Sequence, residues 1–243
     1  LLSCSLRAPR WMAAPARSQG VGRQGRLSAR AQKEVRDAGA GPDEVPQVTI
    51  ITPTLNGAEW IPECVASVAQ QDVRVEHLFV DGGSTDGTAD LIARSAPAAR
   101  VLPAPGTGIY GALNLGLEAS SAEFVCLLNC DDQLMPGALS AALRCARDSD
   151  ADVFSGDADV FAADAAGVDD RLTLRDTLTR QGRLDLGQVL IGVPIINARV
   201  FRRRLFSQFG AFSTSYPLAG DREFLARLAR NGVTAAHVEQ RVY

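Results

Sequence analysis

From residue 48 onward, short apolar runs alternate with segments in which apolar residues recur every three to four positions. Short apolar runs bounded by turn residues are typical of buried strands, and the longer recurrence is typical of helices. We expect strands over 48–52, 76–80, 100–102, 124–131 and 152–155. We expect helices over 61–68, 88–92, 109–119, 138–147 and 224–229. This alternation favours an α/β fold with a Rossmann-type, mostly parallel sheet flanked by helices, and the looser pattern after Gly156 indicates a less regular C-terminal part.

One apolar run, 124–128, is followed closely by two adjacent acids, Asp131 and Asp132. Open α/β sheets bind ligands in the crevice beyond the carboxyl ends of their strands, where these acids are expected. Neighbouring carboxylates repel each other unless a cation or strong donors hold them, and a hard divalent cation carrying a phosphate is the usual partner. A solvated turn after the strand explains the same residues. On the residues alone, both interpretations stay open.

Two further loops follow strands at the same expected edge. Residues 52–57 contain a proline, an asparagine and a glycine, which break the strand and expose backbone groups. Residues 81–88 combine glycines, which allow close backbone approach, with polar side chains that can bind a base, a ribose or a helix end. A role of Asp86 or Thr88 as the N-cap of the helix that follows is compatible with ligand binding by this loop. Asp81 ends a buried strand, so a second acid is expected in the crevice that Asp131 faces.

Three segments together resemble a known family, the glycosyltransferases of the GT-A fold, family 2 type, which move a sugar from a nucleotide-sugar to an acceptor. The segments are 48–56 (VTIITPTLN), 80–88 (VDGGSTDGT) and 128–132 (LNCDD). The resemblance runs from residue 48 to the chain end, most strongly in the first half. It is nearest to bacterial members that make cell-surface polysaccharide or glycolipid.

The resemblance implies a donor site at these loops. Asp81 would contact uracil or another base, Asp131 the ribose region, and Asp132 a divalent cation, Mg or Mn, bound to the donor diphosphate. The nucleotide-binding residues implied are Thr52, Pro53, Asn56, Asp81, Ser84, Asp86, Asn114 and Asp131. The implied partners are a nucleotide-sugar donor, UDP-linked, and a saccharide or lipid-linked acceptor.

A weaker match at 218–228 resembles the start of the family's acceptor-side helix and implies that Asp221 is the general base. An inverting transfer needs a carboxylate near the acceptor hydroxyl, on the face opposite the leaving diphosphate, to take the hydroxyl proton as the new bond forms. Alternatively, Asp221 caps the helix that follows. Glu223 is expected to be a charge on the helix surface.

The chain departs from the family pattern at several positions. Family members usually have an acid at the position of Gly111 and a lysine at that of Leu115, and many have a histidine near 194–197. The chain also stops at Tyr243, where relatives generally continue, so we expect a domain shortened at its C-terminal end. These departures favour one alternative, a nucleotide-sugar-binding protein that does not catalyse transfer.

A second alternative is an NAD(P)-binding dehydrogenase. Gly106, Gly108 and Gly111 have the spacing of a dinucleotide-binding loop, and Asp131 follows 20 residues after the last of them. However, two strand-helix units precede this loop, and the spacing does not account for Asp81 or Asp132.

Composition and charge separate the start of the chain from the rest. Residues 1–33 contain seven basic residues and no acid, which is typical of a transit peptide or of an upstream extension. The remainder has 18 basic and 28 acidic residues, so we expect no nucleic-acid binding. We therefore predict a disordered basic head with a linker over 1–46 and the transferase domain over 47–243. Five scattered cysteines and the lack of a long apolar run favour a cytoplasmic protein whose membrane contact is peripheral at most.

Overall fold

A computed structural model describes residues 45–163, 169–174, 179–180, 182–192, 196–197 and 199–243. All of them belong to one compact unit, Ala40–Tyr243. The predicted basic head and most of the linker lie outside the described residues, so the domain boundary at residue 47 stays a prediction.

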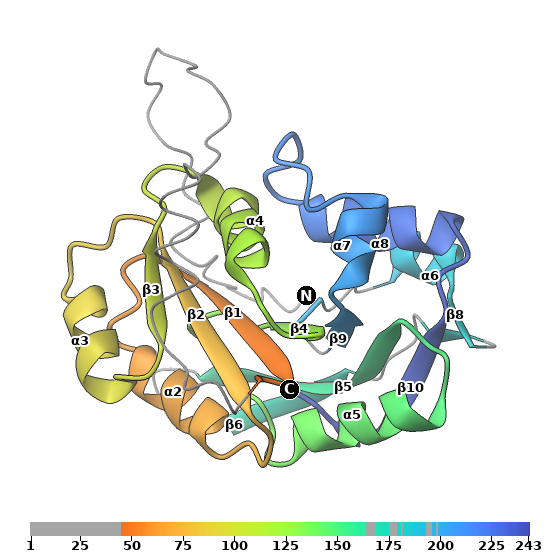
Figure 1. Cartoon of the computed structure of the whole chain (residues 1–243), viewed down its shortest axis with the longest axis horizontal. Coiled ribbons are helices and arrows are strands. Elements are labelled where there is room, and N and C mark those ends of the chain that lie inside the picture. The colour runs from red at the N-terminus through yellow and green to blue at the C-terminus, as the bar shows by residue number, and fades with distance from the viewer. Residues whose placement is uncertain (1–44, 164–168, 175–178, 181, 193–195, 198) are drawn as a thin grey trace. The chain divides into compact units, whose positions relative to one another are not determined.

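Eight strands of the described residues form one sheet (Figure 1). Seven follow the spatial order β10-β5-β9-β4-β1-β2-β3, and β6 (Asp169–Leu174) pairs with β5. The seven are β1 (Val48–Thr54), β2 (Val75–Asp81), β3 (Arg100–Pro103), β4 (Phe124–Leu127), β5 (Val153–Ala163), β9 (Arg199–Arg202) and β10 (Ala235–Arg241). β9 runs antiparallel to β4 and β5, whereas the other neighbours along this order pair in parallel. The predicted α/β class with a mostly parallel sheet is therefore confirmed.

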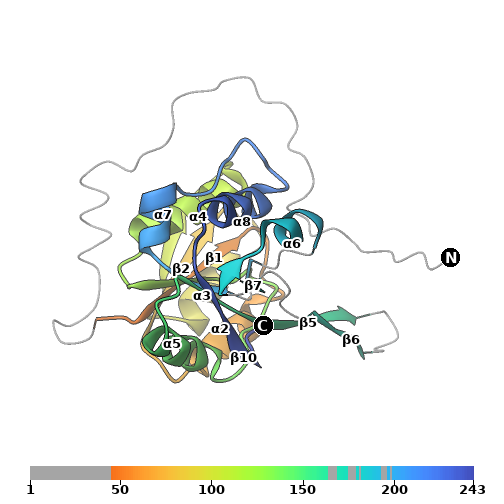
Figure 2. The same ribbon diagram turned by 90° about the vertical axis from the view of Figure 1, so that its right-hand side faces the viewer.

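Helices cover both faces of the sheet (Figures 1 and 2). One face carries α2 (Ile61–Ala69), α3 (Thr88–Ser95) and α5 (Ala138–Asp148), and the other carries α4 (Gly108–Ala119), α7 (Arg204–Phe209) and α8 (Gly220–Arg230). The short α6 (Leu186–Ile191) packs beside α8, and β7 (Thr179–Arg180) pairs with β8 (Arg183–Leu184). Every helix among the described residues is too short or too polar to span a lipid bilayer.

Side chains on the two faces of β1 and β9 pack into different hydrophobic cores. Ile50 and Val200 join the aliphatic core under α2 and α5. On the opposite face, Ile51 packs against α4 at Gly116, where a Cβ atom would lie 2.3 Å from Ile51 Cγ2. Phe201 packs against aromatic rings of α7 and α8 on that same face. Because strand residues alternate between faces, the continuous apolar runs in the sequence reflect burial on both sides.

Two predicted boundaries were wrong. β4 ends at Leu127 rather than at Asp131, because the chain turns there, with Asp132 N donating to Asn129 O at 3.1 Å. β5 extends to Ala163 rather than ending at Ser155, because its second half pairs with β6 in a hairpin.

Candidate active site

The loops predicted to bind the donor follow strands that end at one edge of the sheet. β1, β2 and β4 are parallel, so the loops 55–60, 82–87 and 128–137 leave the sheet on the same side. β9 is antiparallel, so its first residues lie at this edge as well, two positions after Asn197. The end of β10 brings Tyr243 to the same edge. This is the position at which open α/β sheets bind ligands.

Hydrogen bonds join the first two loops to each other. Asn56 N donates to Ser84 Oγ at 2.8 Å, and Thr85 N donates to Asn56 Oδ1 at 2.9 Å. Ala58 N donates to Asp86 Oδ2 at 3.1 Å. Asn56 has a φ of 52°, a left-handed conformation that asparagine tolerates better than most residues. The structure thus brings the candidate residues Asn56, Ser84 and Asp86 together, and their side chains fix the shape of the paired loops.

Asp86 also ties its loop to the start of α3. Its Oδ1 accepts hydrogen bonds from the hydroxyl and the backbone N–H of Thr88. The Thr88 hydroxyl, assisted by the backbone N–H groups of Ala58 and Thr88, lowers the pKa of Asp86 below its usual value. The N-cap position of α3 is held by Gly87, with a φ of 87°, and not by Asp86 or Thr88.

Asp81 is half-buried at the end of β2, where its carboxylate holds the glycine loop. Oδ2 accepts from Gly83 N at 3.2 Å and from Ser84 N at 3.0 Å, and Oδ1 accepts from the Ser84 hydroxyl. Gly83 has a φ of 97° and lies against Pro105. The loop therefore closes tightly around the Asp81 carboxylate.

Thr52 and Pro53 are buried within β1. The Thr52 hydroxyl lies 2.9 Å from His77 Nε2 on β2, and Pro53 is in register with Val80. Burial lowers the pKa of His77 to about 3, so the ring is neutral near neutral pH. The Thr52 hydroxyl is therefore already bonded inside the sheet.

The acid pair lies in the turn after β4, with Asp131 exposed and Asp132 half-buried. Asp132 Oδ2 accepts a hydrogen bond from Asn197 Nδ2 at 3.0 Å, and the same nitrogen donates to Tyr243 Oη at 3.1 Å. Burial, with the charge of Asp131, raises the pKa of Asp132 to about 6. Burial also raises the pKa of Tyr243 well above 10. A carboxylate, an amide and a neutral phenol thus form one network.

The surroundings of Asp132 fit a hard cation. A half-buried carboxylate with a like charge beside it is stabilised by positive charge. Among the described residues, no group of three or more His, Cys, Asp or Glu side chains could hold a metal ion by itself. Mg²⁺, however, usually binds one or two carboxylates together with substrate phosphates and water. Asp132 with a bound diphosphate would meet that requirement.

Asp221 lies in the first turn of α8, on a different element from the donor loops. Its Oδ1 accepts a hydrogen bond from Tyr110 Oη of α4 at 3.0 Å. The N-cap position of α8 is Ala219, so Asp221 does not occupy it. Glu223 lies half-buried on the same helix and forms an ion pair with Arg227 at 2.7 Å.

Asn114 makes its described contacts away from the donor loops. Its Nδ2 donates to Phe212 O at 2.9 Å, and Phe212 N donates to its Oδ1 at 2.9 Å. This reciprocal pair joins α4 to the segment before α8.

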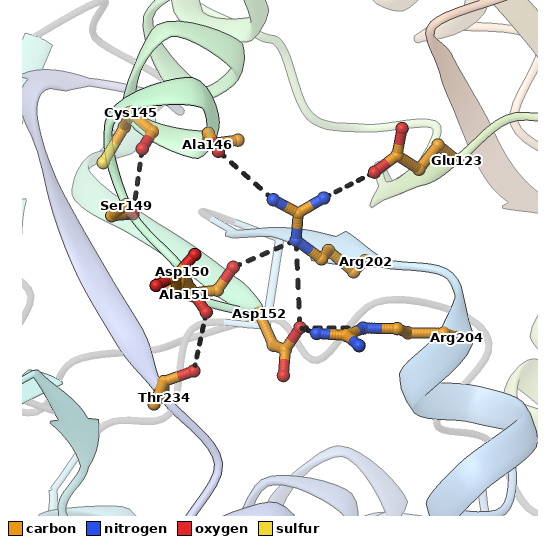
Figure 3. A network of polar contacts seen from close by, with 10 residues as sticks. All are labelled: Glu123, Cys145, Ala146, Ser149, Asp150, Ala151, Asp152, Arg202, Arg204 and Thr234. Carbon is orange, nitrogen blue, oxygen red and sulfur yellow. Dashed lines mark hydrogen bonds and ion pairs between the residues drawn. The ribbon is translucent and has the colours of Figure 1, made fainter.

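A separate polar network lies at the opposite edge of the sheet (Figure 3). Arg202, at the end of β9, donates to Glu123 and to the carbonyls of Ala146 and Ala151. Asp152 accepts from Arg204 and lies 3.8 Å from Arg202 Nε. These charges are paired with one another where β4 and β5 begin, so the network ties the starts of these strands to α5 and α7.

Reasoning from the sequence missed three residues of this site: Tyr110, Asn197 and Tyr243. Tyr110 is 111 positions from its partner Asp221, and Asn197 is 65 positions from Asp132. No local spacing in the sequence signals contacts at such separations.

Comparison with known proteins identifies what the chain is similar to. A family model described as "Glycosyl transferase family 2" matches residues 49–210. A "PGL/p-HBAD biosynthesis glycosyltransferase" of Mycobacterium bovis is 30% identical over 195 residues, which cover 76% of this chain and 71% of the relative. An "Uncharacterized glycosyltransferase" of Mycobacterium tuberculosis is 27% identical over 190 residues, with 76% and 69% covered.

Solved structures show the same fold. TarS of S. aureus, in complex with UDP, superposes with a TM-score of 0.64 at 20% identity over 81% of this chain. The mannosyltransferase PcManGT of Pyrobaculum calidifontis, in complex with GDP-Man and Mn²⁺, gives a TM-score of 0.59 at 24% identity over 85% of this chain. The chain spans 59% of each of these two solved chains.

Proposed function

The chain belongs to glycosyltransferase family 2, and from that membership we propose that it is an inverting transferase that moves a sugar from a nucleotide-sugar, UDP-linked, to an acceptor hydroxyl. The observation that carries the proposal is the arrangement of acids at one sheet edge. Asp81 ends β2 and Asp132 follows β4, the two parallel strands on either side of β1, and Asp221 lies on α8, on the face of the sheet that also carries α4.

The paired loops after β1 and β2 form the donor side. Asp81 holds the glycine loop in a shape that leaves backbone groups for a base and ribose, and Asn56 and Asp86 keep the two loops together. In this proposal Thr52, Pro53 and Ser84 shape the base subsite from within, Asp131 faces the ribose region, and Asn114 acts indirectly through Phe212. TarS with UDP-GlcNAc and PcManGT with GDP-Man bind nucleotide-sugars in the same fold, which supports a donor of this class.

Asp132 is the proposed ligand of a divalent cation bound to the donor diphosphate. Bound there, a divalent cation, Mg²⁺ or Mn²⁺, supplies positive charge that stabilises the leaving diphosphate. Asn197 donates to Asp132 and thereby fixes the orientation of the carboxylate. The negative charge of Asp131 and the burial of Asp132 favour a bound cation at this position.

Asp221 is the proposed general base. The acceptor oxygen bonds to the anomeric carbon from the face opposite the diphosphate, and its proton passes to the Asp221 carboxylate. The bond between the anomeric carbon and the diphosphate oxygen breaks, and the nucleoside diphosphate leaves with the bonding electrons. Attack from the opposite face inverts the configuration at that carbon.

The acceptor that we propose is saccharide or lipid-linked, for cell-surface polysaccharide or glycolipid synthesis. Exposed apolar side chains flank the first turn of α8, and they are Leu190, Ile191, Tyr216 and Leu218. Arg222 of α8 donates to the carbonyls of Val189 and Leu190, which holds the end of α6 beside that turn. An apolar surface next to the proposed base favours an acceptor with an apolar portion. The name of the Mycobacterium bovis relative, a "PGL/p-HBAD biosynthesis glycosyltransferase", is compatible with this class.

The two alternatives to a transferase are a dehydrogenase and a protein that binds the nucleotide-sugar without catalysis. Family membership argues against the dehydrogenase alternative. The glycines at 106–111, which suggested that alternative, connect the edge strand β3 to α4. Binding without catalysis is favoured by the uncharged Gly111 and Leu115. Gly111 lies against Thr107, where a Cβ atom would approach Thr107 Cβ to 2.8 Å, so an acid at this position would require Thr107 to move.

Release of nucleoside diphosphate from defined donors tests the proposal. The full chain is incubated with UDP-glucose, UDP-galactose, UDP-N-acetylglucosamine or GDP-mannose, with and without Mn²⁺, and with p-nitrophenyl glycosides as soluble acceptors. We expect Mn²⁺-dependent consumption of a UDP-sugar and a product of inverted anomeric configuration by NMR. Donor binding without consumption would favour the non-catalytic alternative, and a retained configuration would contradict the inverting mechanism.

A further inference from the structure

Tyr110 is placed to control the carboxylate that the proposed function uses as its base. Its side chain is 7% exposed, and Oη donates to Asp221 Oδ1 at 3.0 Å. Burial raises the pKa of Tyr110 to about 12, while the backbone N–H of Asp221 has the opposite, smaller effect. The phenol therefore keeps its proton and remains a donor over the whole working pH range.

The ring of Tyr110 is fixed on both sides. A Cβ atom at Gly220 would lie 2.8 Å from Tyr110 Cδ2 and 2.9 Å from Cε2, so only glycine lets the first turn of α8 come this close. On another side the ring stacks on Phe212, with centroids 5.7 Å apart and an interplanar angle of 29°. Because the ring packs between Gly220 and Phe212, its hydroxyl is held beside Asp221.

α4, the helix that carries Tyr110, also holds the acceptor side through Asn114. Asn114 lies one turn after Tyr110 and bonds both the N–H and the carbonyl of Phe212. Phe212 in turn packs against Phe224 of α8, with centroids 4.9 Å apart. α4 therefore fixes both the carboxylate of Asp221 and the segment that leads into its helix.

We infer that Tyr110 is a positioning residue for the transfer reaction: by donating to Oδ1 it fixes the Asp221 side chain, so that Oδ2 is presented to the acceptor hydroxyl. The inference rests on the proposed function, because it assumes that Asp221 is the base. An aspartate on the first turn of a helix can adopt several rotamers, and a charge-assisted hydrogen bond from a rigid partner selects one of them. Proton transfer depends steeply on such geometry.

Tyr110→Phe removes the hydroxyl and keeps the ring against Gly220 and Phe212. We expect kcat for sugar transfer to fall about 10- to 100-fold, the range for loss of a hydrogen bond to a charged group. The donor KM and the UDP affinity should stay within about twofold, because the donor loops are untouched. The matched control is Ser207→Ala, which removes an exposed hydroxyl of α7 that donates to Arg204 O at 2.9 Å and should leave turnover unchanged.

A double-mutant cycle separates positioning from a general structural effect. In the Asp221→Asn background, Tyr110→Phe should cause little further loss of kcat, because both changes act through one group. Full additivity, or a Tyr110→Phe variant with parental kcat while Asp221→Asn is inactive, would overturn the inference and leave the proposed function standing. If Asp221→Asn itself transfers sugar at the parental rate, both the role of Asp221 and the inference fail. Thermal unfolding of each variant checks that the fold is retained.

Discussion

The donor side and the acceptor side of the site are held in different ways. On the donor side, short loops bond to each other directly, as Asn56 does to Ser84 and Thr85, over separations of 28 and 29 residues. On the acceptor side, Asp221 and Phe212 are held by α4 over separations of 111 and 98 residues. The paired loops after β1 and β2 thus hold each other, whereas the acceptor side takes its geometry from α4. Substitutions should therefore separate donor binding from turnover.

The largest separation is expected from Asp221→Asn. The amide keeps an oxygen that can accept from Tyr110, but it cannot take up a proton, so turnover should fall about 10²- to 10⁴-fold. UDP affinity and the melting temperature should stay close to the parental values. Steady-state kinetics measure the turnover, and isothermal titration measures the UDP affinity. The control is Asp90→Asn, which alters an exposed acid in the first turn of α3 and should leave both quantities unchanged. Equal loss of affinity and turnover would contradict the division.

Gly116→Val tests whether α4 supports both sides. The new side chain would overlap Ile51, a fully buried residue of β1, and overpacking of this kind typically costs about 1–3 kcal/mol. We expect a lower free energy of unfolding in urea, with both donor affinity and turnover reduced. Glu118→Val introduces the same residue at an exposed position of α4 and should be nearly neutral. Parental stability of Gly116→Val would mean that α4 does not pack on β1 as described.

Asp86→Ala is expected to act on the donor side alone. It removes the acceptor used by Ala58 N and by the hydroxyl and N–H of Thr88, so the paired loops should loosen. We expect UDP affinity to fall roughly tenfold, which corresponds to about 1.4 kcal/mol of binding free energy. The kcat at saturating donor should be retained. Calorimetric titration of UDP compares this variant with Asp90→Ala. A lower kcat at unchanged donor affinity would reverse the assignment.

The last effect concerns the pH dependence of stability and His77, which lies within the sheet on the donor side. In the unfolded chain its ring takes up a proton near pH 6.5, whereas in the fold its pKa is about 3. Because the unfolded state binds the extra proton, stability falls as the pH drops below 6.5, by about 1–2 kcal/mol at pH 5. His77→Gln should flatten the dependence of the melting temperature on pH between 7 and 5. An unchanged slope in His77→Gln would refute the role of His77.

The same difference between the two sides explains what the sequence could predict. The apolar runs of β1, β2 and β4 and the glycine loop 82–87 are local patterns, and they sufficed for the fold and for the place of Asp81 and Asp132. The reversal of β9 depends on pairing with strands distant in sequence, and it brings Asn197 to Asp132. Likewise, nothing around Tyr110 indicates that its hydroxyl bonds Asp221. Such contacts follow from tertiary packing, which periodicity and spacing do not encode.

The central claim is that the loops after β1, β2 and β4 bind a nucleoside diphosphate through Asp132 and a divalent cation, independently of the acceptor side. Isothermal titration of UDP into the parent chain, Asp132→Asn and Asp221→Asn, each with and without Mn²⁺, tests it most directly. We predict saturable binding that depends on Mn²⁺ in the parent and in Asp221→Asn, and at least tenfold weaker binding without Mn²⁺ dependence in Asp132→Asn. Unchanged affinity and Mn²⁺ dependence in Asp132→Asn, or no UDP binding by the parent, would contradict the account.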